Sequence, residues 1–316
     1  MGYLLGIDGG GTHTTAWLAD DRLDILARVQ AGPSNPIKVG IATAQRELAR
    51  TCRRALREAR VPPSKLDAVC AGLAGGDSAV VHRKMLRWLR QSVPARAHLM
   101  TTDAAITLAA ALGESEGVIV IAGTGSIAFG RDAKGRILRV GGWGSLLDDA
   151  GSGYDIGRKA IAAALRAHDG RGKPTRLTEA ICREFRLSGI NEVVATPLTA
   201  QKIAALFPRV QEAARAGDAV ARSLCREAAA HLAELAVTTI HHLARKRQPV
   251  RVVCSGGVFQ SSALIHRAFT RQVHGGAPQA RVSLLQREPV EGALLLARQL
   301  AQAPPTKHRI ARRHTG

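Results

Sequence analysis

The sequence predicts an α/β protein that contains two similar halves. Each half opens with an apolar run, a short glycine-rich turn and a second apolar run, first over residues 4–18 and again over residues 117–129. Each half then continues with a third strand-like segment and with helical patterns that alternate with strands. Apolar runs on both sides of a glycine turn are typical of a β-hairpin. The repeat therefore predicts two mixed sheets with helices packed on them.

In the first half, the apolar spacing of residues 41–59 predicts an amphipathic helix, which Pro62 and Pro63 end. A cluster of glycine, proline, serine and asparagine at residues 32–36 predicts a loop. The other elements that we expect are strands over residues 24–29, 66–73 and 98–102, a helix over residues 78–89, and an Ala-rich helix that begins at Asp103.

The second half repeats this order with a longer helical insertion. We expect strands over residues 117–121, 127–129 and 136–140, helices from residue 152 to about residue 245, strands over residues 250–254 and 281–285, and a last helix over residues 290–301. With 316 residues and 46% hydrophobic composition, the chain is long and apolar enough for two domains.

Composition limits the possible compartments and partners. Basic residues outnumber acidic ones by 45 to 25, which gives a formal charge of +20. Such a charge is compatible with nucleic acid, a membrane surface, an anionic substrate or Arg-rich usage alone. We favour solvated basic faces, because no aromatic platform is interleaved with the basic residues. No apolar run reaches the roughly 20 residues of a membrane span, and the five cysteines lack C-x-x-C spacing. We therefore expect a cytoplasmic protein with reduced thiols.

The first glycine turn carries the residues with the clearest chemistry. Gly9, Gly10 and Gly11 tolerate a positive φ and let backbone N–H groups approach an anion. Thr12 adds a hydroxyl donor, and Asp8 is placed at a strand end where it can hold a hydrated Mg²⁺ ion. The alternative is a plain hairpin turn. The spacing fits neither the P-loop nor the dinucleotide-binding pattern.

Three glycine turns follow strand-like segments, at residues 8–12, 123–126 and 255–257. Together with the duplicated pattern they resemble the superfamily of sugar kinases, heat-shock chaperones and actin. The resemblance implies duplicated actin-like (ribonuclease H-like) ATPase domains that flank a nucleotide cleft, with two turns on the phosphates and the third near the adenosine. The ATP-binding residues that it implies are Gly10, Gly11, Thr12, Thr124, Gly125, Gly256 and Gly257.

Residues 101–105, 141–145 and 149–154 carry a narrower resemblance, to N-acetylglucosamine kinases and the BadF/BadG/BcrA/BcrD ATPases grouped with them. It implies an ATP- and Mg²⁺-dependent kinase that phosphorylates the 6-hydroxyl of N-acetylglucosamine or glucosamine, with Asp103 as general base. The substrate-binding residues that it implies are Asn35, Asp77, Ser126, Gly142, Trp143 and Asp149. We also expect a homodimer without a membrane or nucleic-acid partner.

The resemblance also implies where the domains begin and end. Residues 1–112 form the N-terminal ATPase domain, and residues 113–287 form the C-terminal one. The helix over residues 288–303 returns to the first domain, where Gly292 and Ala293 make a close helix–helix contact. Residues 304–316 form a basic tail that we expect to be disordered.

Each candidate residue also has a structural interpretation. Asp103 could be a helix N-cap, Asn35 and Asp149 could form loop Asx-turns, and Trp143 could plug its loop instead of stacking on a sugar. The family commonly has Gly-Asp-Glu-Gly where this chain has Asp-Asp-Ala-Gly at residues 148–151, which leaves the identity of the sugar open.

Two other functions remain as alternatives. An ATP-driven activator of a radical dehydratase or reductase resembles this fold, but it holds an iron–sulfur cluster through cysteines early in its second domain. The sequence has no cysteine between Cys70 and Cys182, which disfavours this function. The second alternative, a nucleotide-dependent nucleic-acid or chaperone-like binder, is suggested only by the charge of +20.

Overall fold

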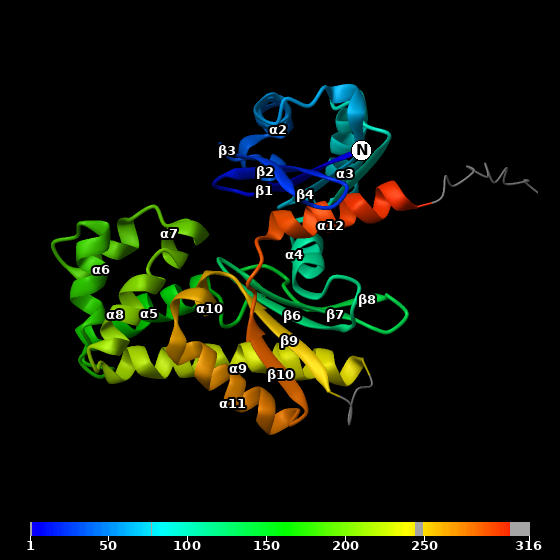
Figure 1. Cartoon of the computed structure of the whole chain (residues 1–316). Helices are drawn as coiled ribbons and strands as arrows, with labels where there is room; N and C mark the ends of the chain where they lie inside the picture. Colours follow the sequence, from blue (N-terminus) through cyan, green and yellow to red (C-terminus); the bar gives the residue numbers. More distant parts are fainter. Residues whose placement is uncertain (1, 77, 244–248, 304–316) are drawn as a thin grey trace, which may run out of the picture. The chain divides into compact units, whose positions relative to one another are not determined.

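The computed structural model describes residues 2–76, 78–243 and 249–303. The chain divides into two compact units. One unit is formed by residues up to Gly113 and from Arg287 onward, and the other by Glu114–Gln286. Figure 1 shows the two sheets, the first in blue and cyan and the second in green and orange. We describe each unit by itself.

The sheet of the first unit has the strand order β3-β2-β1-β4-β5. The first three strands form an antiparallel meander, and β4 and β5 run parallel to β1. The strands are β1 (Tyr3–Gly9), β2 (Thr14–Asp20), β3 (Ile25–Ala31), β4 (Leu66–Leu73) and β5 (Ala97–Thr102). All three parallel strands therefore end at the same edge of the sheet.

Helices cover both faces of this sheet (Figure 1). They are α1 (Pro36–Val39), α2 (Ile41–Glu58), η1 (Pro63–Lys65), α3 (Ala79–Ser92), α4 (Asp103–Leu112) and α12 (Pro289–Gln302). Alternate side chains of β1 bury on opposite faces, because Leu5 belongs to the core under α2 and α3 while Leu4 belongs to the core under α4 and α12. The last helix of the chain thus completes the first unit.

Helix α12 contacts α4 closely because Gly292 has no side chain. A Cβ atom on Gly292 would overlap the backbone of Ile106 and lie 2.6 Å from the amide nitrogen of Ala110. The close helix–helix contact expected at Gly292 is therefore confirmed. The helix also contacts β1 and β4, which lie far earlier in the sequence.

The sheet of the second unit has the order β10-β9-β6-β7-β8, which repeats the topology of the first sheet strand for strand. Again a three-stranded antiparallel meander is followed by two strands parallel to its first strand. The strands are β6 (Gly117–Ala122), β7 (Ser126–Arg131), β8 (Ile137–Gly141), β9 (Val250–Ser255) and β10 (Ala280–Leu284). The duplication predicted from the sequence is confirmed.

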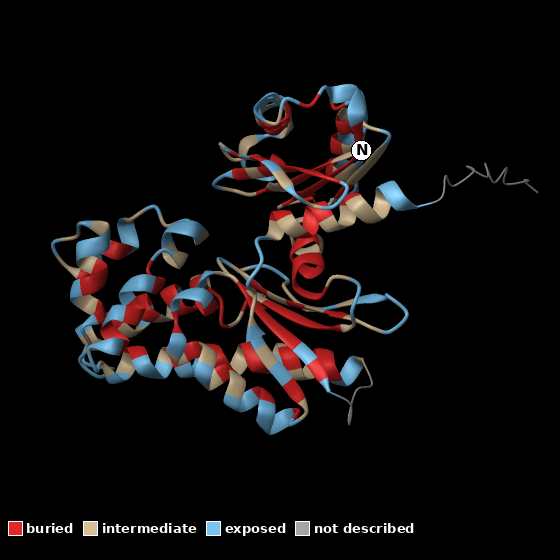
Figure 2. Cartoon of the chain, viewed as in Figure 1, coloured by how far each residue is buried: buried red, intermediate tan, exposed pale blue. Residues whose placement is uncertain are grey.

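The helices of the second unit build one large core with this sheet. They are α5 (Gly153–His168), α6 (Leu177–Phe185), η2 (Ile190–Ala195), α7 (Ala200–Ala204), α8 (Phe207–Arg215), α9 (Ala219–His242), α10 (Gly257–Ser261) and α11 (Ala263–Gly276). Helix α9 contacts β6, β7 and β8, and α11 packs along α9. Buried residues, red in Figure 2, follow the strands and the inner faces of these helices.

The sequence predicted nearly every strand and long helix, and the α/β fold class is confirmed. It did not predict the short helix α1, which follows Asn35 in the expected loop, nor α10 after the third glycine turn. Within the described residues, no helix combines the length and the apolar character that crossing a membrane requires. The expected basic tail lies outside the described residues.

Candidate active site

The first glycine turn links β1 to β2 through Gly10–His13. The Gly10 amide donates to the carbonyl of His13 at 2.9 Å, and the Gly10 carbonyl accepts from the amides of Ser34 and Asn35. Gly9, Gly10 and Gly11 do not use the positive φ that glycine tolerates, because none of them is among the residues with positive φ. Glycine is needed here for space: a Cβ on Gly10 would lie 2.9 Å from the His13 carbonyl oxygen.

Thr12 and Lys38 lie at the exposed side of this turn. The Thr12 hydroxyl lies 3.0 Å from Nδ1 of His13, and both residues are exposed. A Cβ on Gly11 would be 2.7 Å from Nζ of Lys38, so a lysine ammonium group lies directly beside the turn. Backbone amides, a hydroxyl and an ammonium group together form a suitable environment for phosphate oxygens.

Asp8 and Asp103 belong to the same edge of the first sheet. Asp8 pairs with Gly72 of β4, and Gly72 pairs with Thr101 of β5, two residues before Asp103. Ligands of open α/β sheets bind outside the carboxyl ends of the parallel strands. The fold therefore brings the predicted metal ligand and the predicted base to one edge of the sheet.

Asp103 is the first residue of α4 and is half-buried. The N-cap is Thr102, whose hydroxyl accepts from the Ala105 amide at 3.1 Å, so the interpretation of Asp103 as the cap was wrong. Oδ1 of Asp103 accepts from the Ala104 amide at 2.9 Å. This bond and the helix start orient the carboxylate at the sheet edge.

The surroundings of Asp8 disfavour its charge. Burial, the nearby Asp103 carboxylate and, more weakly, Glu288 raise the pKa of Asp8 to about 6, although His13 lowers it. Such a carboxylate gains from a cation, and oxygen donors are the ligands that Mg²⁺ prefers. Among the described residues, no group of three or more His, Cys, Asp or Glu side chains could hold a metal ion.

Asn35 is buried and caps α1. Its Oδ1 accepts from the amides of Ile37 at 2.9 Å and Lys38 at 3.3 Å, which leaves the side-chain amide donors for other partners. The Asx-turn interpretation of Asn35 is confirmed, while its contact with a sugar stays a prediction. The predicted substrate residue Asp77 lies outside the described residues.

The second glycine turn lies between β6 and β7 and rests on the start of α5. The Gly123 amide donates to the Gly125 carbonyl at 2.9 Å. The carbonyl groups of Gly123 and Thr124 accept from the amides of Gly153 at 2.8 Å and Tyr154 at 3.3 Å. Thr124 is exposed at the tip of the turn.

Asp149 and Ser126 tie the following loop to this turn. Ser126 donates its hydroxyl hydrogen to the carbonyl of Ala150 at 2.9 Å. The buried Asp149 carboxylate accepts from the backbone amides of Ser126 and Gly144. Burial raises the pKa of Asp149, and the two amides and Arg139 partly oppose that rise. Both residues thus have partners within the unit, and their contact with a sugar stays a prediction.

Trp143 does not plug its loop, because 69% of its surface is exposed. The guanidinium group of Arg139 lies 5.0 Å from the centre of its ring, and Nε of Arg139 donates to the Gly141 carbonyl at 3.1 Å. Arg139 also donates to the carbonyl of Gly142. The loop can turn here because Gly141 and Gly142 have φ angles of 71° and 73°. An exposed indole ring held in place by an arginine is suited to stacking on a ligand.

The third glycine turn lies beside the second. Gly256 has a φ of 94°, and a Cβ there would overlap the carbonyl oxygen of Ala122, the last residue of β6. Gly257 begins α10 and has open space around its Cα. The parallel pairing of Ile121 with Ser255 brings the two turns to one edge of the second sheet.

The predicted residues that the structure describes thus gather at one sheet edge in each unit. Asp8, the first turn, Asn35 and Asp103 belong to the first unit, and the remaining candidates belong to the second. Sequence reasoning missed Lys38, Glu288 and Arg139. Glu288 had a local signal, the capping-box pattern that it forms with Glu291 before α12. Lys38 and Arg139 are ordinary surface cations in the sequence, and only the fold reveals their neighbours.

Comparison with known proteins identifies the family. The sequence matches the BadF/BadG/BcrA/BcrD ATPase family over residues 5–297. It is 32% identical over 302 residues to the N-acetylmuramic acid/N-acetylglucosamine kinase of Clostridium acetobutylicum, covering 94% of this chain and 99% of the relative. The N-acetyl-D-glucosamine kinase of Dictyostelium discoideum is 29% identical over 311 residues, covering 93% of this chain and 97% of the relative.

A solved structure agrees with these relatives. A protein of Chromobacterium violaceum, provisionally named an N-acetylglucosamine kinase, superposes with a TM-score of 0.78 at 28% identity, covering 94% of this chain and 99% of that protein. The family expected from the three glycine turns and the Gly-Gly-Trp-Gly loop is therefore confirmed. The chain belongs to the BadF/BadG/BcrA/BcrD ATPase family.

Proposed function

We propose that this protein is an ATP-dependent amino-sugar kinase that transfers the γ-phosphoryl group to the 6-hydroxyl of N-acetylglucosamine or glucosamine. The observation that carries the proposal is the pair of carboxylates, Asp8 and Asp103, at one edge of the first sheet. The activities named for the two curated relatives, which match almost the whole chain, support the substrate class.

Asp103 is the proposed general base. As the sugar hydroxyl attacks the γ-phosphorus, its oxygen forms the new P–O bond and its proton passes to Asp103. The bond between the γ-phosphorus and the bridging oxygen breaks, and ADP leaves. The position of Asp103 at a helix start, beside strand ends and only half-buried, supports this role. A positioned base contributes about 10²–10⁴-fold to such a step.

Asp8 is the proposed ligand of Mg²⁺, through water or directly. When bound, the ion would neutralise charge on the transferring phosphoryl group. The raised pKa of Asp8 supports this role, because the protein itself leaves that carboxylate poorly compensated. The amides of Gly10 and Gly11, with Thr12 and Lys38, would hold phosphate oxygens from the first unit.

The second unit would supply the remaining contacts. Thr124 and Gly125 would meet phosphate oxygens, and the Gly256–Gly257 turn would support the adenosine. The exposed ring of Trp143, braced by Arg139, is suited to the apolar face of a sugar. Gly142, Ser126 and Asp149 would shape this part of the substrate site. The two units are the proposed ATPase domains.

A sugar panel with a base-removed variant tests the proposal. ADP release is coupled to a colour reaction with N-acetylglucosamine, glucosamine, N-acetylmuramic acid and glucose as acceptors. We expect one of the amino sugars to stimulate ADP release strongly, and Asp103→Asn to lower its kcat about 10²–10⁴-fold. The matched control is Asp21→Asn, an exposed aspartate of the same unit. Equal kcat values for wild type and Asp103→Asn would show that Asp103 is not the general base. If no sugar stimulates ADP release, the proposed kinase activity is wrong.

A further inference from the structure

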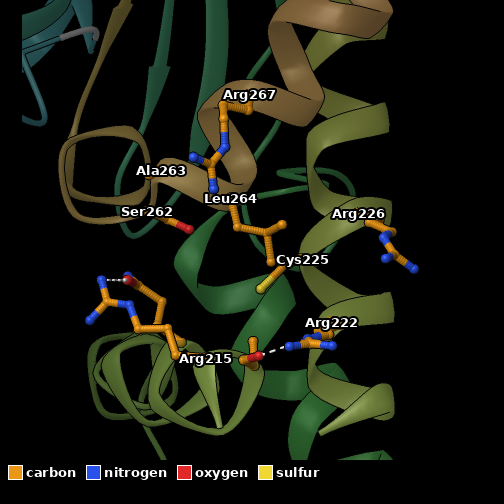
Figure 3. A pocket seen from close by; sticks show the side chains of 10 residues that line it. Arg215, Arg222, Cys225, Arg226, Ser262, Ala263, Leu264 and Arg267 are labelled. Atoms are coloured by element: carbon orange, nitrogen blue, oxygen red, sulfur yellow. Dashed lines mark hydrogen bonds between the residues drawn. The ribbon is translucent and has the colours of Figure 1, made fainter. Parts of the chain in front are cut away.

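A cavity of about 330 Å³ opens in the second unit, where α8, the first half of α9 and the start of α11 meet (Figure 3). None of the glycine turns lines it. Its volume is within the usual range for small-molecule sites, roughly 300–1,000 Å³. The cavity therefore lies outside the proposed kinase site and has room for a ligand of its own.

Arginines from three helices surround this cavity. Arg215 comes from the end of α8, Arg222 from α9 and Arg267 from α11. In Figure 3 the guanidinium group of Arg267 points down toward Ser262 and Leu264, while Arg226 points away from the other three arginines. Arginine matches phosphate geometry better than lysine, because its planar group donates several hydrogen bonds at fixed angles.

The bonds that hold two of these arginines involve only neutral acceptors. Arg215 donates to Oε1 of Gln211 and to the carbonyl of Ser261, both at 3.2 Å. Nε of Arg222 donates to the carbonyl of Ala214 at 2.9 Å. Within the described part of the chain, no carboxylate lines the cavity and no ion pair joins Arg215, Arg222 or Arg267. Neutral acceptors thus position the guanidinium groups of Arg215 and Arg222.

The start of helix α11 also presents hydrogen-bond donors and partial positive charge to the cavity. Ser262 is its N-cap and accepts from the Ile265 amide at 3.3 Å, so the amides of Ala263 and Leu264 remain without intrahelical acceptors. The helix has 14 residues, and its positive dipole end faces the cavity lined by Ser262, Ala263 and Leu264. The arginines and the helix end thus favour the same kind of ligand.

The floor of the cavity is apolar. Ala214 and Cys225 are buried there, and Leu264 lies beside them. Burial raises the pKa of Cys225 to about 11, so the thiol stays neutral and acts as a small apolar group. A ligand that covers this floor therefore needs an apolar or ring-shaped part in addition to its anionic group.

We propose that this cavity is a binding site for a small organic phosphate. Its phosphate group would meet Arg215, Arg222, Arg267 and the start of α11, and its organic part would cover Ala214, Cys225 and Leu264. Charge-assisted hydrogen bonds from several guanidinium groups are the strong form of phosphate recognition. A polyanion would instead spread over the many exposed basic side chains of the chain and would not need an apolar floor.

Calorimetric titration with phenyl phosphate tests this site. The protein is first saturated with AMPPNP and Mg²⁺, and the titration is run at 0.15 M salt. We expect saturable binding with one site, at least fivefold tighter than that of inorganic phosphate because of the ring. Arg222→Gln and Arg267→Gln should each weaken binding at least fivefold. The matched control Arg271→Gln removes the same charge one turn further along α11 and should change it less than twofold.

Several results would overturn the proposal. The first is the absence of saturable binding, and the second is that Arg271→Gln weakens binding as much as the cavity variants do. The third is that a short RNA displaces phenyl phosphate and binds all variants equally. Each result would mean that the phosphate responds to the diffuse positive charge of the surface. A crystal soaked with 4-bromophenyl phosphate gives an independent readout that does not depend on any variant. We expect a bromine anomalous peak over Leu264 and Cys225, and a peak only elsewhere would contradict the site. Neither measurement needs turnover, so the site can fail while the kinase proposal stands.

Discussion

Asp8 and Asp103 are two carboxylates that the fold places at one edge of the first sheet. Their mutual repulsion is part of what raises the pKa of Asp8 to about 6. Proteins keep such arrangements mainly at functional sites, where a ligand or metal ion supplies the missing charge. The two aspartates are therefore the residues on which the chemical account depends most.

Removal of the Asp8 carboxylate should lower activity without lowering stability. We expect Asp8→Asn to lower kcat/KM for Mg²⁺·ATP by about 10²-fold or more, because the variant cannot hold the ion that stabilises the transferring phosphoryl group. Its melting temperature without ligands should equal or exceed that of the wild type at pH 8, since the variant removes a poorly compensated charge. Kinetic titration with Mg²⁺·ATP and thermal melts check both parts. A less stable variant with unchanged kcat/KM would show that Asp8 is structural.

Replacement of Gly256 should destabilise the fold for a steric reason that does not apply to Gly257. At a φ of 94°, an alanine there is strained and its Cβ overlaps the carbonyl oxygen of Ala122. We expect Gly256→Ala to lower the free energy of unfolding by about 2–4 kcal/mol. Gly257→Ala has open space and should change it by less than about 1 kcal/mol. Urea denaturation of both variants measures the difference, and equal effects would contradict the steric explanation.

At single positions, the sequence predicted residue chemistry better than residue partners. Asp8, Asp103 and the glycine turns could be found because strand-end glycines and carboxylates are local signals. The ties from Asp149 to Ser126 and Gly144, and the position of Lys38 beside Gly11, depend on how loops pack. For Gly10 the sequence left two reasons open, space and φ, and only the structure shows that space is the one that applies.

Helix α5 is the element that fixes the second glycine turn. Its first amides bind the carbonyl groups of Gly123 and Thr124, so the start of the helix must be held firmly. Asp155 does this from the first turn of the helix. Its carboxylate accepts from the Gly151 amide at 3.0 Å and pairs with Lys159 at 2.8 Å. Although burial acts to raise the pKa of Asp155, these bonds outweigh it and hold the pKa below its ordinary value.

The stability that Asp155 contributes should depend on pH. A carboxyl whose pKa is lower in the folded state stabilises the fold above the unfolded pKa of about 3.9, and this contribution is lost as pH falls through the lowered value. We expect Asp155→Asn to reduce the free energy of unfolding by about 1–3 kcal/mol at pH 7, and by much less at pH 3. Urea denaturation at pH 7, 5, 4 and 3 measures the difference in the free energy of unfolding between wild type and Asp155→Asn.

The exposed Asp169, at the far end of α5, provides the control for this prediction. Asp169→Asn should change stability little at any of these pH values, because its bonds with Arg171 are exposed to solvent. A constant gap between wild type and Asp155→Asn from pH 7 to pH 3 would mean that Asp155 acts by packing and not by its charge.

The length of a helix or strand decided whether the sequence could predict it. The long amphipathic helix α2 and the apolar strands have enough residues for a periodic pattern, and they were found. The short α1 and α10 have four and five residues, and no periodicity develops over one turn. Both begin where a local cap or turn directs them, at Asn35 and Gly256.

At the scale of the whole molecule, duplication is the organising feature. Two sheets with the same strand order each present a glycine turn between their first two strands. The repeat of hairpin, third strand and alternating helices was visible in the sequence, whereas the return of the helix over residues 288–303 to the first domain was implied only by the family resemblance. The sequence could not show the arginine-lined cavity of the second unit, because its residues come from three separate helices. The expected homodimer and the cytoplasmic location stay predictions.

Identification of the product tests whether the protein phosphorylates the 6-hydroxyl of an amino sugar. The protein is incubated with Mg²⁺·ATP and an equal mixture of N-acetylglucosamine and glucosamine, and the phosphorylated sugar is isolated and examined by proton–phosphorus correlation spectroscopy. We expect a single amino-sugar product in which phosphorus couples to the two protons on carbon 6, formed in equal amount to ADP. Release of ADP and free phosphate without any phosphorylated sugar, or coupling to a proton at another carbon, would contradict it.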